Sequence, residues 1–459
     1  MINSKTKFQR KQKLKGSVID LTFQGLGVVK INNFPIFVAN ALIGEKIFFS
    51  LTRVFSHYAF GKLIKIIQKS PYRVDNYHPE MIESGIAPLV NLSYTSQLKY
   101  KQEQIKKLFH KFGLKNVKVL PTIGMKKPKH YRNKTVVPVK FDNDKNKLIT
   151  GFYKRGSHKL VPIEDYFLND PKIDKTVSIV RKILNSFHIS AYSEITRKGI
   201  LRYLMVRRGR ATGQMMVGIV STNKKLPFER EIVSLIRKKI SGLASLILNY
   251  NPKPSNVQLG TKNRVLFGKQ TIQDILLGYK FDISINSFYQ VNPQTTAILY
   301  KKAADIANLK GSEVAVDAYS GIGTIGISIS TLVKKVIGVE IISQAVKNAK
   351  KNLLINNIKN VHYINADASK QFTKWSKDKL KPDIVFVDPP RKGLDPKLIN
   401  SLVKTFPKKI LYISCNPTTL ARDSYLLTKR GYFISKPVQP IDQFPQTMHV
   451  ESITLFLHK

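Results

Sequence analysis

The chain has 459 residues, with 77 Lys and Arg against 29 Asp and Glu, and its formal net charge is +48. This length predicts about two or three domains, and a hydrophobic content of 42% is typical of a globular chain and not of a disordered one. A general bias toward Lys explains part of the excess charge. A polyanionic partner, RNA or DNA, explains more of it.

Cys415 is the only cysteine, which excludes a disulfide within the chain and a cysteine-based metal cluster. No segment approaches about 20 uninterrupted apolar residues, so no membrane span is predicted. The first 15 residues are polar and basic, without the apolar region of a secretory signal. We therefore expect a soluble, cytoplasmic protein, and we expect it to be a monomer.

Residues 1–15 predict a basic arm, and residues 16–69 predict a small β-barrel. Five short apolar runs, separated by Gly and Asn, fit five strands: Ser17–Leu21, Gly27–Ile31, Phe34–Val38, Lys46–Thr52 and Ala59–Ile67. Five strands in this length are typical of oligonucleotide-binding barrels. The segment resembles a TRAM domain, an RNA-binding barrel of RNA-modifying enzymes, in its Gly25–Val28 run, a Phe-Val pair and Ile43-Gly44-Glu45.

Residues 70–284 predict a central α/β domain that binds RNA, joined to the barrel by a linker at Ser70–Arg73. Apolar residues at helical spacing predict a helix at about 94–112, which we expect to pack on the catalytic domain. Further runs predict the strands Lys134–Phe141, Tyr203–Arg207 and Met215–Val220 and the helix Ile173–Phe187. Two basic clusters, Tyr131–Lys134 and Arg207–Arg210, are either solvated charged faces or RNA contacts; Arg132 and Lys134 are the candidate contacts.

Residues 285–459 alternate between strand and helix, which predicts a doubly wound parallel sheet. The expected strands are 313–318, 335–340, 361–365, 383–388 and 409–414, with helices at 322–333 and 343–356. The last two runs, Phe433–Pro437 and Glu451–His458, have no helix between them, so the sheet should end in an antiparallel hairpin. A parallel sheet with a reversed last strand is typical of the class I, Rossmann-like methyltransferase fold, with S-adenosylmethionine as methyl donor.

A Gly-rich turn after the first strand of this region marks the cofactor site. Gly321, Gly323 and Gly326 match the dinucleotide fingerprint, and Glu340 ends the next strand, so a nicotinamide enzyme is one alternative. Asp317, however, precedes the glycines where a pyrophosphate would have to approach. Asp317, Glu340 and Asp367 end successive strands, and such carboxylates favour the positive charges of S-adenosylmethionine.

A second group of residues suits methyl transfer to a pyrimidine. Carbon 5 of uracil becomes nucleophilic when a thiolate adds to carbon 6, and a base must later remove the carbon-5 proton. Cys415 and Asp388 each stand at the end of an apolar run, and Glu451 leads into the last one. Cys415 could supply the nucleophile, Glu451 the catalytic base, and Asp388 a group that holds the edge of the uracil. The alternatives are a buried apolar cysteine and a surface acid. Asp388-Pro-Pro also resembles a motif of amino-group methyltransferases, but Arg391 replaces its aromatic residue.

Five ordered segments resemble the RNA uracil-5-methyltransferase family: Ser287–Asn292, Val316–Gly323, Asp388–Gly393, Ile413–Pro417 and His449–Glu451. The resemblance implies that Cys415 is the nucleophile and Glu451 the base. It also implies that Gln290, Tyr319, Glu340 and Asp388 bind the methyl donor or the target base, and that Phe288 lies near the flipped base. Our own assignments add Asp367, Asp317 and Gly321 to the cofactor site, with Thr324 as a weaker contact.

The chain departs from the family in one respect. Many members bind an iron–sulfur cluster through four cysteines, and the matching positions here are His78, Ser84, Ala87 and Tyr166, so we expect no cluster. The resemblance also implies 23S rRNA as the substrate, because the tRNA-specific branch generally lacks the N-terminal barrel. A tRNA methyltransferase and a non-catalytic rRNA-binding assembly factor remain the alternatives.

Overall fold

The computed structural model describes residues 8–75 and 78–459 and divides the chain into two units. Unit 1 comprises Met1–Lys101 with two later segments, Phe152–Val161 and Phe444–His449. Unit 2 comprises Gln102–Gly151, Pro162–Gln443 and Val450–Lys459. Residues 1–7 of the expected basic arm, and residues 76–77, lie outside the described residues.

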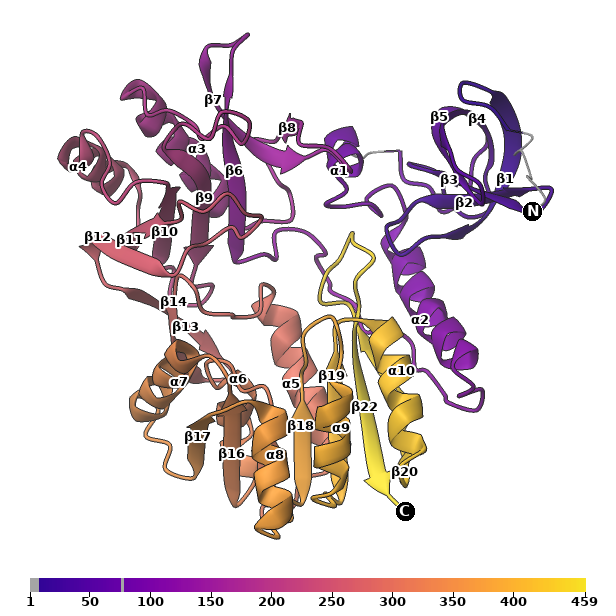
Figure 1. Cartoon of the computed structure of the whole chain (residues 1–459), viewed down its shortest axis with the longest axis vertical. Helices are drawn as coiled ribbons and strands as arrows, with labels where there is room; N and C mark the ends of the chain where they lie inside the picture. Colours follow the sequence, from indigo (N-terminus) through magenta and orange to yellow (C-terminus); the bar gives the residue numbers. More distant parts are fainter. Residues whose placement is uncertain (1–7, 76–77) are drawn as a thin grey trace. The chain divides into compact units, whose positions relative to one another are not determined.

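Unit 1 contains a closed five-stranded barrel with the strand order β1-β2-β3-β5-β4 (Figure 1). Its strands are β1 (Lys13–Leu21), β2 (Gly27–Ile31), β3 (Phe34–Val38), β4 (Lys46–Val54) and β5 (Ala59–Gln68). Strand β1 begins three residues before the predicted barrel and so includes part of the expected arm. A Cβ atom on Gly61 would lie 2.8 Å from the Phe49 ring, so this glycine lets the strand close over the core. The predicted barrel is confirmed.

The rest of unit 1 is fixed to the barrel by buried polar contacts. The Arg73 guanidinium donates to the Glu45 carboxylate at 2.6 Å, and both side chains are almost fully buried. The predicted linker segment therefore has a defined position against the barrel. Two helices begin in this unit, α1 (Pro79–Ser84) and α2 (Tyr94–Lys111). In unit 2, the second half of α2 packs Ile105 and Phe109 into the core of the catalytic sheet.

The central part of the chain forms a seven-stranded sheet with the order β12-β11-β10-β9-β6-β7-β8. Its strands are β6 (Lys134–Asp142), β7 (Lys147–Tyr153), β8 (Leu160–Pro162), β9 (Leu201–Arg208), β10 (Met215–Ser221), β11 (Leu243–Tyr250) and β12 (Lys262–Gly268). The accompanying helices are α3 (Pro171–Ser186) and α4 (Glu229–Lys239). Helix α3 begins where the Asp170 side chain accepts a hydrogen bond from the Lys172 amide, and it buries one apolar stripe.

The C-terminal sheet has the order β17-β16-β15-β18-β19-β22-β20, with β21 paired to β22. Its strands are β15 (Val314–Asp317), β16 (Lys335–Glu340), β17 (Val361–Asn365), β18 (Ile384–Val387), β19 (Lys409–Ser414), β20 (Tyr432–Ile434), β21 (Gln439–Ile441) and β22 (Glu451–His458). Strands β15 to β19 pair in parallel, and β22 runs antiparallel to both β19 and β20 (Figure 1). The predicted class I methyltransferase fold with a reversed last strand is confirmed.

Helices around this sheet are α5 (Pro293–Ala307), α6 (Thr324–Ser328), α7 (Ser343–Ile355), α8 (Ala368–Lys377), α9 (Pro396–Val403) and α10 (Pro417–Thr428), and a hairpin, β13 (Thr271–Leu276) and β14 (Tyr279–Ser284), precedes them. The predicted helix 322–333 is wrong in extent: α6 has five residues and is followed by a short 3-10 helix, Ser330–Leu332. The Asn360 side-chain amide donates to the Ser330 and Val333 carbonyls and so ties this short helix to the residues just before β17.

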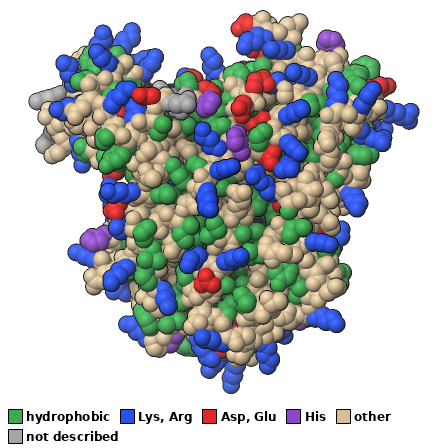
Figure 2. Space-filling view, turned by 180° about the vertical axis from the view of Figure 1, so that it is seen from behind, with side chains coloured by type: hydrophobic (Ala, Val, Ile, Leu, Met, Phe, Trp, Pro, Cys, Tyr) green, Lys and Arg blue, Asp and Glu red, His purple; other side chains and the backbone are tan. Residues whose placement is uncertain are grey.

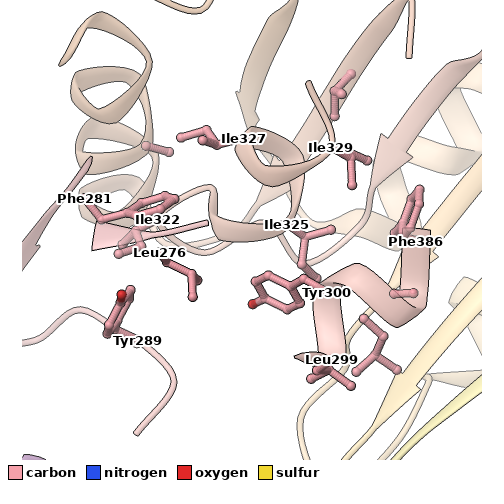
Figure 3. Packing of buried hydrophobic residues seen from close by; sticks show 14 of the residues in the cluster. Leu276, Phe281, Tyr289, Leu299, Tyr300, Ile322, Ile325, Ile327, Ile329 and Phe386 are labelled. Atoms are coloured by element: carbon pink, nitrogen blue, oxygen red, sulfur yellow. The ribbon is translucent and has the colours of Figure 1, made fainter. Parts of the chain in front are cut away.

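One apolar core joins the hairpin and both sheets of unit 2. Figure 3 shows Tyr300 of α5 beside Ile325 of α6, and Phe281 of the hairpin near Ile322. The same cluster contains residues of the central sheet (Met205, Met216, Ile247) and of the catalytic sheet (Ala315, Phe386, Leu411). Among the described residues, no helix is both long and apolar enough to cross a membrane.

Candidate active site

Four predicted functional residues lie at one edge of the catalytic sheet. Strand β15 ends at Asp317 and β16 at Glu340, while Asp388 and Cys415 directly follow β18 and β19. These four strands are parallel neighbours in the order β16-β15-β18-β19, so their carboxyl ends meet at the same edge. In open sheets of this kind the crevice outside these strand ends is where ligands bind.

Glu451 reaches the same edge from the opposite chain direction. It is the first residue of β22, and Ser452 of that strand pairs with Ser414, the last residue of β19. Because the two strands are antiparallel, the start of β22 lies beside the end of β19. Glu451 is therefore placed next to Cys415, although the two residues are far apart in sequence.

The turn that carries Cys415 is tied to the loop after β18. The Asn416 side chain accepts a hydrogen bond from the Thr418 amide at 3.1 Å, which caps α10, and its amide group donates to the Arg391 carbonyl at 2.8 Å. The backbone amide of Asn416 donates to the Ser414 hydroxyl at 3.2 Å. Cys415 is thus held, partly exposed, between a strand end and a capped helix.

The electrostatics of this group are those of a desolvated acidic site. Burial raises the pKa of Cys415 to about 12, and the nearby Glu451 and Asp388 carboxylates add to this while Arg391 opposes it. Burial and the Asp388 charge raise the pKa of Glu451 well above its usual range. Burial and the Asp317 charge likewise raise the pKa of Asp388. The Cys415 thiol therefore carries its proton at neutral pH in the free protein, burial favours the neutral form of Glu451, and substrate binding must change the state of the thiol before it can act.

Glu451 is available to a ligand by hydrogen bonding as well. Its side chain is 2% exposed, and Oε2 has no hydrogen-bond partner among residues 8–75 and 78–459. An unsatisfied buried carboxyl oxygen is costly unless something completes it. A hydrogen-bond partner for Glu451 Oε2 must therefore come from a bound ligand or from water.

The Gly-rich turn after β15 is occupied by carboxylates and not open to a phosphate. The Gly321 amide donates to Glu340 at 2.9 Å, and the Gly326 amide donates to Asp317 at 3.2 Å. Gly323 has a φ of +90°, and a Cβ there would lie 2.4 Å from the Tyr363 hydroxyl, so both the conformation and the space require glycine. A pyrophosphate needs such amides free, so the nicotinamide alternative loses its main support.

Asp317 fits a positively charged cofactor. It is fully buried, and burial raises its pKa to about 7 against the opposing effect of the Gly326 and Tyr319 amides. Within the described part of the chain, its Oδ1 atom has no hydrogen-bond partner. These residues would hold S-adenosylmethionine through the cation-carboxylate attraction that they offer, and that cofactor would supply an electrophilic methyl group.

Asp367 stabilises the start of helix α8. It is the N-cap of α8 and accepts hydrogen bonds from the Ser369 hydroxyl and the Lys370 amide, which lower its pKa. Tyr319 lies near this acid, since burial and the charges of Asp367 and Asp395 raise its pKa to about 12. The cofactor roles predicted for both residues stay predictions.

Gln290 and Phe288 are presented by a segment that buried polar side chains hold in place. The buried Gln290 accepts a hydrogen bond from Gln443 Nε2 at 3.4 Å, whereas Phe288 is 71% exposed. The Arg207 guanidinium donates to the Ser284 carbonyl at 2.7 Å and to the Ser287 carbonyl at 2.8 Å. An exposed aromatic ring beside a fixed, buried amide is suited to stacking on a base that has left its helix.

Arg207 corrects one of the sequence interpretations. It is 1% exposed and holds backbone carbonyls, so it is neither a solvated charge nor a surface RNA contact. Arg208 and Arg210 of the same cluster pair with Asp170 at 2.6 and 3.4 Å. Lys134 is paired with Arg207 across β6 and β9, and burial, with the charges of Arg207 and Arg132, lowers the pKa of Lys134 to about 7. The RNA contacts predicted for Arg132 and Lys134 stay predictions.

Tyr300 and Gln443 are site residues that the sequence analysis missed. The Tyr300 hydroxyl lies 3.0 Å from the Thr324 hydroxyl, and burial together with the charges of Asp388, Asp317 and Glu451 raises the pKa of Tyr300. Gln443 bonds the Thr296 hydroxyl as well as Gln290. No local signal marks either one, because Tyr300 has the pattern of a core residue in an amphipathic helix and Gln443 stands in an irregular segment.

No metal centre is found in the part of the chain that the structure describes: it holds no group of three or more His, Cys, Asp or Glu side chains that could bind a metal. Of the positions matched to cluster ligands, Ser84 and Ala87 are buried in unit 1 and Tyr166 is buried in unit 2. The expectation that no iron–sulfur cluster is bound stays a prediction, and it rests on the side-chain chemistry of these residues, since none is a thiol.

Residues 93–459 match the family model described as tRNA (Uracil-5-)-methyltransferase. Two relatives similar over almost their whole length are an uncharacterized RNA methyltransferase of Lactiplantibacillus plantarum, 49% identical over 96% of each chain, and one of Enterococcus faecalis, 43% identical over 95% of each chain.

Among solved structures, the chain is similar to the Pyrococcus abyssi tRNA (uracil-54, C5)-methyltransferase in complex with S-adenosyl-L-homocysteine. The TM-score is 0.76 at 25% identity, and the match covers 97% of this chain and 100% of the other. That structure holds the product that S-adenosylmethionine leaves behind after methyl transfer.

Proposed function

Because the chain belongs to the tRNA (uracil-5-)-methyltransferase family and is an S-adenosylmethionine-dependent RNA methyltransferase, we propose that it methylates carbon 5 of a uridine through a covalent adduct on Cys415. The observation that carries this proposal is the meeting of Cys415, Glu451 and Asp388 at the sheet edge that also holds Asp317 and Glu340. A thiol, a buried carboxyl group and a cation-binding acidic turn at one edge are what this chemistry requires.

In the proposed reaction the Cys415 thiolate forms a bond to carbon 6, and the electron pair of the 5,6 double bond moves onto the ring as an enolate. S-adenosylmethionine, when bound, would supply the methyl group that carbon 5 takes up, with S-adenosylhomocysteine as the second product. Glu451 takes the proton from carbon 5, the double bond reforms, and the thiolate leaves. A carboxylate whose pKa burial has raised is a stronger base than an ordinary one, which suits Glu451 to the proton removal.

The remaining residues position the two substrates. We assign Asp388 and Gln290 to the polar edge of the uracil ring or to the methyl donor, and Phe288 to the face of the extruded base. The target must leave its stack, at a cost of a few kcal/mol. Contacts between basic side chains and RNA phosphates offset this cost, and Lys and Arg side chains outnumber acidic ones over the face shown in Figure 2.

We propose 23S rRNA as the substrate, on the resemblance of the chain to the large-subunit branch of the family that lacks the iron–sulfur cluster. The tRNA alternative has its own support, because a tRNA methyltransferase matches 97% of this chain. The presence of a barrel therefore does not discriminate between the two RNAs.

The deciding experiment uses S-adenosylmethionine with a labelled methyl group. The protein is incubated with separated 23S rRNA, 16S rRNA and tRNA from cells that lack its gene, and each RNA is digested to nucleosides. We expect label in 5-methyluridine from 23S rRNA alone. Label in tRNA would overturn the target and keep the reaction, and label in no fraction would favour the non-catalytic assembly factor.

A pH prediction follows from the buried Asp317. Its pKa of about 7 in the folded protein exceeds the value of about 3.9 for an unfolded Asp. Between these values only the folded state holds the proton, so this group lowers the free energy of unfolding as the pH rises from about 4 to about 7. Asp317→Asn should therefore raise the melting temperature at pH about 8, and it should weaken cofactor binding at least about tenfold by removing a carboxylate from the cation.

Calorimetric titration with S-adenosylmethionine at pH about 6 and about 8 tests both parts. In the unmodified protein the affinity should fall at the lower pH, where Asp317 is protonated, and this fall should be absent in Asp317→Asn. Asp305→Asn, which changes an exposed Asp on α5, is the matched control. An unmodified protein with the same affinity at both pH values would contradict the assignment of Asp317.

A further inference from the structure

Four aromatic rings form a cluster on the outside of the barrel. They belong to Phe37 of β3, to Phe55 and Tyr58 of the β4–β5 loop, and to Phe60 of β5; we call them the aromatic cluster. Phe55 and Tyr58 are stacked with ring centroids 4.7 Å apart and an interplanar angle of 25°. Phe37 lies 5.9 Å from Tyr58 and 5.7 Å from Phe60. Such spacings are those of mutually packed rings, so the cluster is a preformed surface.

The alternation of the strands turns these rings outward. On β3, Ile36 and Val38 point into the barrel core, and Phe37 lies between them on the opposite face. Ala59 is likewise buried while the next residue, Phe60, is half-buried on the outer face. Phe55 is 43% exposed and Tyr58 37% exposed. Apolar rings gathered on an outer surface in this way indicate a binding surface and not a core.

Cations surround the aromatic cluster. Arg53 is paired with Phe60 across β4 and β5, Lys62 follows Phe60 by two residues on the same face, and Lys30 is paired with Pro35 at the neighbouring edge of β3. All three are exposed, and among the described residues none lies within ion-pair distance of a carboxylate.

The wider barrel has the same charge. Residues 8–69 contain ten Lys and Arg and only two acids, and one of these, Glu45, is buried against Arg73. A protein partner would need an unusually acidic surface to match this, whereas a nucleic acid carries a negative charge on every nucleotide.

We propose that the aromatic cluster is a stacking site for unpaired bases of single-stranded RNA, with Arg53, Lys62 and Lys30 contacting its phosphates. Flat rings offer a face on which any base can stack, and flanking cations follow the backbone, which is how single strands are bound without reading their sequence. This inference rests on the proposed function only in that the bound strand belongs to the same RNA as the target uridine.

The test measures RNA binding by the full chain without any methyl transfer. Fluorescence anisotropy with a labelled oligouridylate of about a dozen nucleotides compares the unmodified protein with Phe55→Leu/Tyr58→Leu, which keeps apolar side chains but removes two rings. We expect the dissociation constant to rise about tenfold or more, in keeping with the effect of one or two lost base stacks. Tyr58→Phe, which keeps the ring, should bind as the unmodified protein does.

Phe23→Leu is the matched control, since Phe23 is an exposed aromatic residue of the same barrel, 75% exposed and outside the cluster. Lys62→Ala should lower the slope of log affinity against log salt by about 0.7, as expected for one lost phosphate contact to a single strand. Equal affinity of the Leu double variant and the unmodified protein for the oligouridylate would overturn the proposal. So would an equal loss with an RNA duplex of the same length. Because no methyl group is transferred, these outcomes are independent of whether the proposed reaction is correct.

Discussion

Replacing Cys415 with alanine is expected to reduce methyl transfer to uridine by about 10⁴-fold or more, while S-adenosylmethionine binding changes by less than about twofold. Without the thiolate, no bond forms at carbon 6, so the ring cannot become the enolate whose carbon 5 is nucleophilic. The carboxylates that lie at the same sheet edge are much weaker nucleophiles than a thiolate. The cofactor contacts assigned to Asp317 and Glu340 are not altered, so binding and chemistry should separate.

Two measurements check this result. Transfer of labelled methyl groups to RNA gives the rate, and calorimetric titration gives the cofactor affinity. RNA that contains 5-fluorouridine gives a direct view of the adduct, because fluorine cannot be removed as a proton and the protein stays bonded to carbon 6. The unmodified protein should form a complex with this RNA that survives denaturing electrophoresis, and Cys415→Ala should form none.

Thr418→Ala is the control, since this exposed side chain lies on the first turn of α10, three residues from Cys415, and only its backbone amide takes part in the cap. It should transfer methyl groups at the unmodified rate. A Cys415→Ala protein that still methylates uridine at an undiminished rate would exclude the covalent mechanism.

The second large effect is expected for Glu451→Gln, which should slow turnover by about 10² to 10⁴-fold and cause a covalent RNA–protein complex to accumulate on ordinary RNA. The glutamine cannot take the carbon-5 proton, so the methyl group is transferred but the thiolate cannot leave. Because burial favours the neutral form of Glu451, a neutral amide should be accommodated without loss of stability.

Single-turnover experiments with labelled methyl donor and denaturing electrophoresis distinguish the two steps. We expect the label to appear in the covalent complex at nearly the unmodified rate and to be released slowly. Glu313→Gln is the matched control. Glu313 is also buried, but it lies just before β15, at the opposite end of that strand from Asp317, where it accepts a hydrogen bond from the Lys310 backbone amide. Slow turnover without accumulation of a complex would show that Glu451 acts before methyl transfer and not after it.

The sequence by itself determined the kind of fold and most of the catalytic group. Each of β15, β16, β18 and β19 is a run of apolar residues that ends at or just before a chemically active side chain, and the carboxyl ends of parallel strands must share an edge. Asp317, Glu340, Asp388 and Cys415 could therefore be grouped from local pattern alone. Helices α8 and α9 escaped prediction for different reasons. Helix α8 is largely polar and buries only Phe372 and Trp375, whereas α9 has eight residues, which are too few for a helical repeat of apolar residues to stand out.

Only the tertiary structure decided which charges are buried and which side chains meet across the chain. Arg207 has the sequence context of a surface cluster, yet it is enclosed because it holds the Ser284 and Ser287 carbonyls. Glu451 stands beside Cys415 because the register of β22 on β19 sets it there. The rings of the aromatic cluster meet because β3 and β5 are neighbours in a closed barrel. These features depend on pairing between distant segments and on the desolvation that packing imposes, and neither is encoded in the local order of residues.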